Sequence, residues 1–168
     1  MITGMAQSQA AIHTIFGAGQ VGVPLARLLA EAGHRVRLIR RGPAGPHIDG
    51  VQWLRGDATE RSFRDAACRG ASVVYNCANP SHYARWDGLE PLFTGIRKAA
   101  GRAGARLVQL DNLYLYGRPR HHPFDESEKP APGSSKGEQR LRLRDELFEA
   151  HARGQVVATC GHASDFFG

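Results

Sequence analysis

The sequence has few cysteines and no long apolar segment, and both shortages limit the class of protein to which it can belong. No apolar run approaches the roughly 20 residues of a membrane-spanning helix, so we expect no membrane segment. The three cysteines are far apart and lack CxxC spacing, which predicts reduced thiols in a cytoplasmic protein. His121 and His122 have no third ligand at suitable spacing, so the sequence predicts no metal site. The absence of a GxSxG motif disfavours a hydrolase.

Positive charge exceeds negative charge, but the excess is scattered arginine. The net charge is +6, and only three basic residues are lysine: Lys98, Lys129 and Lys136. No segment interleaves the arginines with aromatic residues, as a nucleic-acid-binding surface would. We therefore expect mainly solvated helix faces, a small-molecule substrate and no nucleic-acid partner. A site for an anionic ligand is the other explanation for the excess.

Strand-like and helix-like segments alternate from residue 11 onward. The 168 residues suffice for one domain with a core and are too few for two. We expect residues 1–10 to be a flexible lead-in and residues 11–168 to form the domain. Alternating strands and helices predict an α/β fold with a doubly wound parallel sheet of about six strands. The strand-like segments are residues 11–16, 34–39, 51–56, 71–78, 105–110 and 155–160.

A glycine-rich loop joins the first expected strand to the first expected helix. Gly17, Gly19 and Gly22 have GxGxxG spacing, directly after the strand and directly before the apolar helical pattern. Gly17 permits a tight turn, Gly19 lets a pyrophosphate approach the backbone, and Gly22 lets the helix pack on the sheet. Backbone amides at the start of the helix, with Gln20 and Val21, then hold the phosphates. The loop predicts a Rossmann-type dinucleotide-binding domain with strand order 3-2-1-4-5-6.

The end of the second expected strand indicates which dinucleotide binds. Domains that bind NAD usually place a carboxylate there, which accepts a hydrogen bond from the ribose 2′-hydroxyl. This chain has Arg40 and Arg41 instead, and guanidinium groups pair with a 2′-phosphate. We therefore predict NADP as cofactor, with NAD as the alternative. Solvent-facing arginines without a ligand remain the other interpretation.

Several further segments occur in the order found in one known family. Together with the glycine loop, they resemble the short-chain dehydrogenase/reductase superfamily, in its extended or atypical NAD-dependent epimerase/dehydratase family. The resemblance spans residues 12–168, and its further segments are 56–58, 76–78, 113–117, 124–130 and 162–168. It implies that Asp57 and Ala58 lie near the adenine, and that Cys77 and Ala78 line the cofactor ribose. Cys77 as a small core residue and Cys77 as a reactive thiol both remain open.

The catalytic residues that this resemblance implies are largely replaced. The family uses a Ser or Thr after the fifth strand and a Tyr-x-x-x-Lys pair on the next helix. Alignment on Gly117 puts Asn112 at the serine position, Lys136 at the lysine position and Pro132 at the tyrosine position. Asn112 can donate a hydrogen bond to a substrate carbonyl, and Lys136 is either a ribose ligand or a surface residue. Candidates for the missing hydroxyl are Tyr114, Tyr116, Ser134 and Ser135.

The resemblance leaves the function of the chain open between an enzyme and a binding protein. Extended members are longer, so it implies that their C-terminal substrate-binding portion is missing here. We expect an oxidoreductase or epimerase acting on a sugar-nucleotide or a related carbonyl compound. A non-catalytic NADP(H)-binding pseudo-enzyme and a truncated fragment are the alternatives. Residues 89–100 and 141–148 match the helices through which the superfamily forms homodimers, but both helices could equally face only their own sheet.

Overall fold

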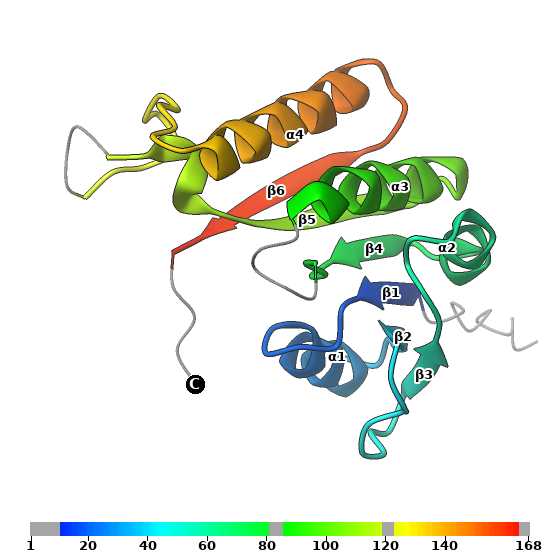
Figure 1. Cartoon of the computed structure of the whole chain (residues 1–168). Helices are drawn as coiled ribbons and strands as arrows, with labels where there is room; N and C mark the ends of the chain where they lie inside the picture. Colours follow the sequence, from blue (N-terminus) through cyan, green and yellow to red (C-terminus); the bar gives the residue numbers. More distant parts are fainter. Residues whose placement is uncertain (1–10, 81–85, 119–122, 165–168) are drawn as a thin grey trace, which may run out of the picture.

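A single six-stranded parallel sheet forms the centre of the molecule (Figure 1). The computed structural model describes residues 11–80, 86–118 and 123–164. The sheet order is β3-β2-β1-β4-β5-β6, and every neighbouring pair is parallel, which confirms the predicted fold and strand order. The strands are β1 (Ile12–Phe16), β2 (Arg35–Arg40), β3 (Val51–Arg55), β4 (Val73–Asn76), β5 (Arg106–Asn112) and β6 (Ala158–Ala163).

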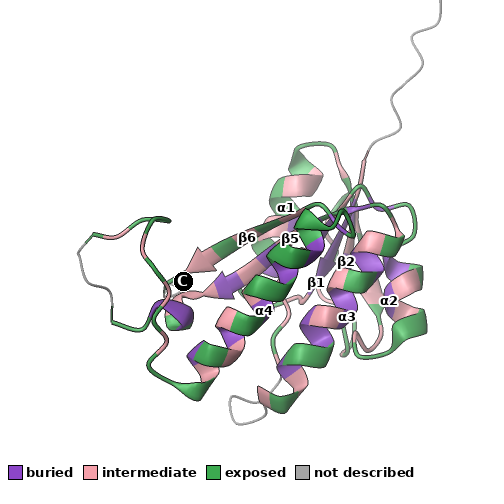
Figure 2. Cartoon of the chain, turned by 90° about the horizontal axis from the view of Figure 1, so that it is seen from above, coloured by how far each residue is buried: buried purple, intermediate pink, exposed green. Residues whose placement is uncertain are grey.

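Helices cover both faces of this sheet. One face carries α1, and the other carries α2, α3 and α4, with α3 and α4 side by side (Figures 1 and 2). No helix in the described part of the chain is both long and apolar enough to cross a bilayer. The helices are α1 (Gly22–Glu31), α2 (Arg61–Cys68), α3 (Leu89–Arg102) and α4 (Ser135–Ala152), with short 3-10 turns η1 (Trp86–Gly88) and η2 (Leu113–Tyr116).

The core is divided by the sheet into two apolar clusters. Ile15 and Phe16 are adjacent and completely buried, yet they belong to different clusters. Successive side chains of a strand point to opposite faces, so β1 contributes to both layers. Phe16 packs in the cluster with Ile96 of α3, whereas Ile15 packs in the cluster with Ala26 of α1. Burial on both faces explains why β1 lacks strict alternation of apolar and polar residues, and its polar residues His13 and Thr14 are buried as well.

The sixth strand begins later than its sequence pattern predicts. The expected segment was 155–160, but β6 runs from Ala158 to Ala163. The Gln155 N–H donates to the carbonyl oxygen of Ala150 in the turn that ends α4, and Val156 is buried against the larger cluster. The first residues of the expected strand therefore belong to the connection between α4 and β6.

Three predictions concern segments outside the described residues. The lead-in of residues 1–10 is one, and the histidine pair His121 and His122 is another. The segment that resembles the family's last motif is described only as far as residue 164.

Candidate functional site

A cavity of about 770 Å³ lies at the carboxyl ends of the strands, beside the switch point between β1 and β4. In open parallel sheets, this is the place where ligands bind, because the connections diverge there. Turns after four different strands supply its walls, so the fold itself brings together segments that are distant in sequence. The lining residues are Gly17–Val21, Ile39–Gly42, Gly56–Thr59, Cys77–Pro80, Asp87, Gly88, Leu92 and Leu110.

The three glycines of the loop differ in what requires them. Gly17 has φ +101°, and a Cβ atom there would lie 2.7 Å from the carbonyl carbon of Cys77. A Cβ atom on Gly22 would overlap the carbonyl oxygen of Gly17. Gly19 is exposed, lines the cavity and has no atom within 4 Å of the position of an added Cβ. The fold therefore explains Gly17 and Gly22 but not Gly19, and a ligand that approaches the backbone in the cavity would explain Gly19.

The amino-terminal end of α1 is arranged to bind an anion. Its N-cap position, Val21, makes no side-chain capping bond, and its first turn contains no acidic residue. The positive end of the helix dipole is thus not compensated by a side chain of the helix. Gln20 and Val21 both line the cavity at this end. The predicted phosphate-binding residues are therefore together, with Gly22 buried just behind them.

Arg40 and Arg41 are exposed and line the cavity at the end of β2. The Arg40 guanidinium lies 5.9 Å from the ring centroid of Trp53, and the carbonyl oxygen of Arg41 accepts a hydrogen bond from Arg55 Nε at 3.3 Å. The first contact holds the Arg40 guanidinium near the Trp53 ring, and the second anchors the backbone of Arg41. A dinucleotide with a phosphate on its ribose would meet positive charge there.

Asp57 and Ala58 line the cavity after β3. Asp57 Oδ1 accepts two hydrogen bonds of 2.8 Å, from the backbone N–H and the hydroxyl of Thr59. The backbone bond, followed by the hydroxyl bond, holds the pKa of Asp57 below its ordinary value, with a smaller contribution from the charge of Arg41. Asp57 is therefore an ionised carboxylate in a fixed orientation.

Cys77 and Ala78 line the cavity after β4. Burial raises the pKa of Cys77 to about 11, so the side chain is a neutral thiol at physiological pH. The Cys77 side chain packs against the cluster beneath α1, which favours a packing role over a reactive one. The Ala78 N–H donates to Asn76 Oδ1 at 3.2 Å, and this bond orients the wall of the cavity.

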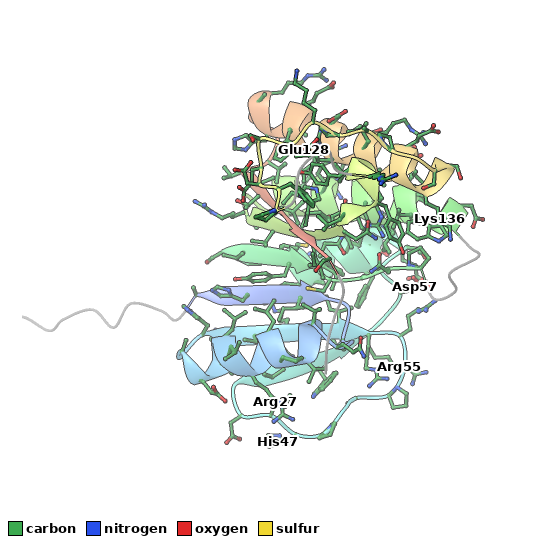
Figure 3. The ribbon with its side chains drawn as sticks, turned by 90° about the vertical axis from the view of Figure 1, so that its left-hand side faces the viewer. Arg27, His47, Arg55, Asp57, Glu128 and Lys136 are labelled. Atoms are coloured by element: carbon green, nitrogen blue, oxygen red, sulfur yellow. The ribbon has the colours of Figure 1, made fainter. Side chains whose placement is uncertain are left out.

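The predicted catalytic residues lie beside the cavity and do not line it. Asn112 ends β5, and its Oδ1 accepts a hydrogen bond from the Tyr114 N–H at 3.1 Å, so this side chain caps η2. Lys136 Nζ lies 4.8 Å from the ring centroid of Trp86, and the ring centroids of Tyr114 and Trp86 are 6.4 Å apart. Trp86 directly precedes Asp87 and Gly88 of the cavity wall, so Lys136 and Tyr114 lie near the cavity through their contacts with Trp86. Figure 3 shows Lys136 and Asp57 on the same side of the molecule.

A buried arginine that the sequence analysis did not single out connects these segments. Arg140 of α4 is 2% exposed and donates to Asp111 Oδ1 at 2.7 Å and to Asn79 Oδ1 at 2.9 Å. Its guanidinium also lies 4.8 Å from the Trp86 ring centroid and 5.1 Å from that of Phe93. Arg140 therefore ties α4, whose first turn contains Lys136, to the cavity wall and to the end of β5.

The ion pair between Arg140 and Asp111 is almost fully removed from water. Burial lowers the pKa of Arg140 and raises the pKa of Asp111, and the attraction between the two charges opposes both shifts. Asp111 Oδ1 also accepts a hydrogen bond from the Asn112 N–H at 2.8 Å. The sequence signal for this pair is the charged residue Asp111 at the end of an apolar strand pattern. Its partner Arg140 lies 29 positions away, so no local spacing indicates their contact.

Comparison with known families identifies the architecture. The sequence matches the NAD dependent epimerase/dehydratase family over residues 14–168. The chain belongs to this family. The match includes the glycine loop, the cavity walls and the segment from Asn112 to Lys136, in agreement with the predicted resemblance. No curated protein matches the sequence.

Solved structures with the same fold include enzymes of the epimerase type. The UDP-glucose 4-epimerase from Brucella ovis, in complex with NAD, matches with a TM-score of 0.78, 16% identity and 91% of this chain covered. The Bordetella bronchiseptica enzyme WbmG, in complex with NAD, matches at 0.74, with 20% identity and 92% covered. A short-chain dehydrogenase/reductase superfamily protein from Agrobacterium tumefaciens, with bound NAD, matches at 0.73, with 26% identity and 89% covered.

The chain spans about half the length of these solved proteins. The matched regions make up 51%, 53% and 48% of the three chains, in the order given above.

Proposed function

We propose that the cavity binds a nicotinamide dinucleotide and that the chain serves an epimerase-like or oxidoreductase reaction on a sugar-nucleotide or related carbonyl compound. Gly19 carries this proposal, because its missing side chain gives the fold nothing and gives a diphosphate access to the backbone. The uncapped start of α1 and the cavity of about 770 Å³ support it. The similar solved structures described with NAD support the class of cofactor.

We further propose that NADP(H) is preferred over NAD(H). The support is the pair of exposed cations at the end of β2, where a domain selective for NAD usually carries a carboxylate. The carboxylate of Asp57 follows the neighbouring strand β3, and the charge of Arg41 contributes to the lowering of its pKa. Arg40 and Arg41 thus provide the positive charge for a 2′-phosphate.

Replacing Arg41 by aspartate tests this preference. We expect the affinity for NADPH to fall about 10- to 100-fold, since one hydrogen bond to a charged group contributes about 1.5–3 kcal/mol. The affinity for NADH should stay the same or rise, because the 2′-hydroxyl can donate to the new carboxylate. Calorimetric titration of both nucleotides measures the change.

The matched control is Arg27→Asp, which makes the same charge change at an exposed position of α1. This control should leave the ratio of the two affinities unchanged. An unchanged ratio in Arg41→Asp, or an equal change in both variants, would show that no 2′-phosphate lies at the end of β2.

For an enzyme, the residues bordering the cavity have defined roles. A bound nicotinamide would supply hydride transfer at the substrate carbon. Lys136 would bind the ribose, the Asn112 amide would donate to the substrate oxygen, and the Tyr114 hydroxyl would give or take the proton. The support is that Lys136 and Tyr114 both lie beside Trp86, and that the Asn112 side chain accepts a hydrogen bond from the Tyr114 N–H. Tyr114 is 42% exposed, so its hydroxyl is accessible to a substrate.

We expect Tyr114→Phe to lower turnover by about 100-fold or more while the dissociation constant of the nucleotide stays unchanged. Turnover with a panel of uridine-diphosphate sugars is measured by nicotinamide absorbance for net oxidation or reduction, and by chromatography of the product sugars for epimerisation. Normal turnover in Tyr114→Phe would exclude this hydroxyl as the proton donor.

A non-catalytic nucleotide-binding protein is the second candidate. The observation that favours it is Pro132, which has no proton to give and stands where the family places its catalytic tyrosine. Nucleotide binding without turnover of any sugar-nucleotide by the wild-type chain would support this candidate over the enzyme.

A further inference from the structure

Three potential metal ligands meet on the last two strands of the sheet. Asp111 of β5 and Cys160 and His162 of β6 have their ligand atoms within 4.8 Å of one another. Asp111 is the register partner of His162, and Cys160 is two residues before His162 on the same strand. Register partners and alternate residues share one face of a parallel sheet, so the strand pairing itself directs the three side chains together.

The spacing of these ligands fits a tetrahedral metal ion. Cys160 Sγ and His162 Nε2 are 3.7 Å apart. A tetrahedral zinc ion with a Zn–S bond of about 2.3 Å and a Zn–N bond of about 2.0 Å separates its sulfur and nitrogen ligands by about 3.5 Å. Thiolate and imidazole select Zn²⁺ and similar transition metals over Mg²⁺ and Ca²⁺, which prefer oxygen ligands.

The surroundings of Asp111 orient its carboxylate as a ligand. The hydrogen bonds from Arg140 Nη1 and from the Asn112 N–H both end on Oδ1. A metal ion can therefore bind at Oδ2 without breaking either bond. Carboxylates that bind metals are usually held by such hydrogen bonds, which fix their orientation. The His162 ring is in turn held edge-on by Tyr116, with a centroid distance of 5.7 Å.

We propose that Asp111, Cys160 and His162 bind one Zn²⁺ ion, with a water molecule as the fourth ligand. Asp111 is buried, whereas Cys160 and His162 are half-buried, so the last two residues are accessible to solvent. On binding, the Cys160 thiol releases its proton to solvent and forms the Zn–S bond, and neutral His162 binds through Nε2. None of the three lines the dinucleotide cavity, so this site stands independently of the proposed function.

Cobalt titration of the full chain tests the site. The protein is prepared without a polyhistidine tag, stripped with a chelator and titrated with Co²⁺ as a spectroscopic probe. We expect one equivalent to produce a thiolate-to-cobalt charge-transfer band together with the visible absorption of tetrahedral Co²⁺, and Zn²⁺ to remove both. Cys160→Ser should lose the charge-transfer band, and His162→Asn should weaken Co²⁺ binding at least about 10-fold.

Two controls keep the result interpretable. Cys77→Ser removes another half-buried thiol and should keep the band and the wild-type affinity. His162→Asn changes a half-buried residue of the edge strand, and its unfolding temperature without metal checks that its fold is retained. Absence of the band in the wild-type chain, its persistence in Cys160→Ser, or its loss in Cys77→Ser alone would each overturn the proposal.

Discussion

Replacing Gly19 by valine should abolish tight dinucleotide binding and leave the stability of the fold almost unchanged. A valine side chain at this position projects into open space, so no contact within the protein opposes it. A diphosphate approaching the loop would meet that side chain and lose hydrogen bonds to the backbone, each contributing about 1.5–3 kcal/mol. The loss of two such bonds predicts an affinity at least about 100-fold lower by calorimetric titration.

Two other glycines provide the controls for this experiment. Gly133 also has open space around an added Cβ but lies outside the cavity, so Gly133→Val should bind the nucleotide normally. Gly22→Ala should lower the free energy of unfolding by about 1–3 kcal/mol, because its Cβ would overlap the Gly17 carbonyl oxygen. Equal nucleotide affinity in Gly19→Val and the wild-type chain would mean that the diphosphate does not contact this loop.

Replacing Arg140 by methionine should lower the free energy of unfolding by about 3–5 kcal/mol, because it leaves the carboxylate of Asp111 buried without its counter-ion. The variant also loses the hydrogen bond to Asn79 and the stacking on Trp86. Urea unfolding at constant pH measures the change. We expect nucleotide affinity to fall as well, because Asn79 forms part of the cavity wall.

Arg144→Met is the matched control for this prediction. Arg144 lies one turn further along α4 and pairs with the exposed Asp145, so its loss should change stability by less than about 1 kcal/mol. The double variant Arg140→Met with Asp111→Leu should be more stable than the Arg140 variant alone, because no charge is left buried. Additive losses in the double variant would show that the two charges do not stabilise each other.

The sequence predicts the fold well because local patterns determine most of it. The strand-turn-helix unit around Gly17–Gly22 and the alternation of strands and helices were enough for the sheet and its order, both confirmed. The start of β6 was wrong because Val156 is apolar whether it lies in a strand or in a turn packed on the core. Burial determines such a boundary, and burial depends on how distant segments pack.

The walls of the candidate site were also accessible from local motifs. Residues that follow parallel strands meet at one edge of the sheet, so short motifs at strand ends could be assigned to one cavity. Arg140 and its partners Asp111 and Asn79 could not be found in this way. They come from α4, β5 and the loop after β4, and no spacing within one segment indicates their contact. The same reason hid Cys160 and His162, which approach Asp111 only through the register of β5 and β6.

The location of the diphosphate tests the central claim most directly. Crystals of the chain grown with saturating NADP⁺ should show the two phosphates within hydrogen-bonding distance of the backbone N–H groups of Gly19, Gln20 and Val21. The adenosine end should lie toward Asp57, with its 2′-phosphate beside Arg40 and Arg41. A diphosphate bound elsewhere, or an empty glycine loop at saturating nucleotide, would contradict the proposed binding site.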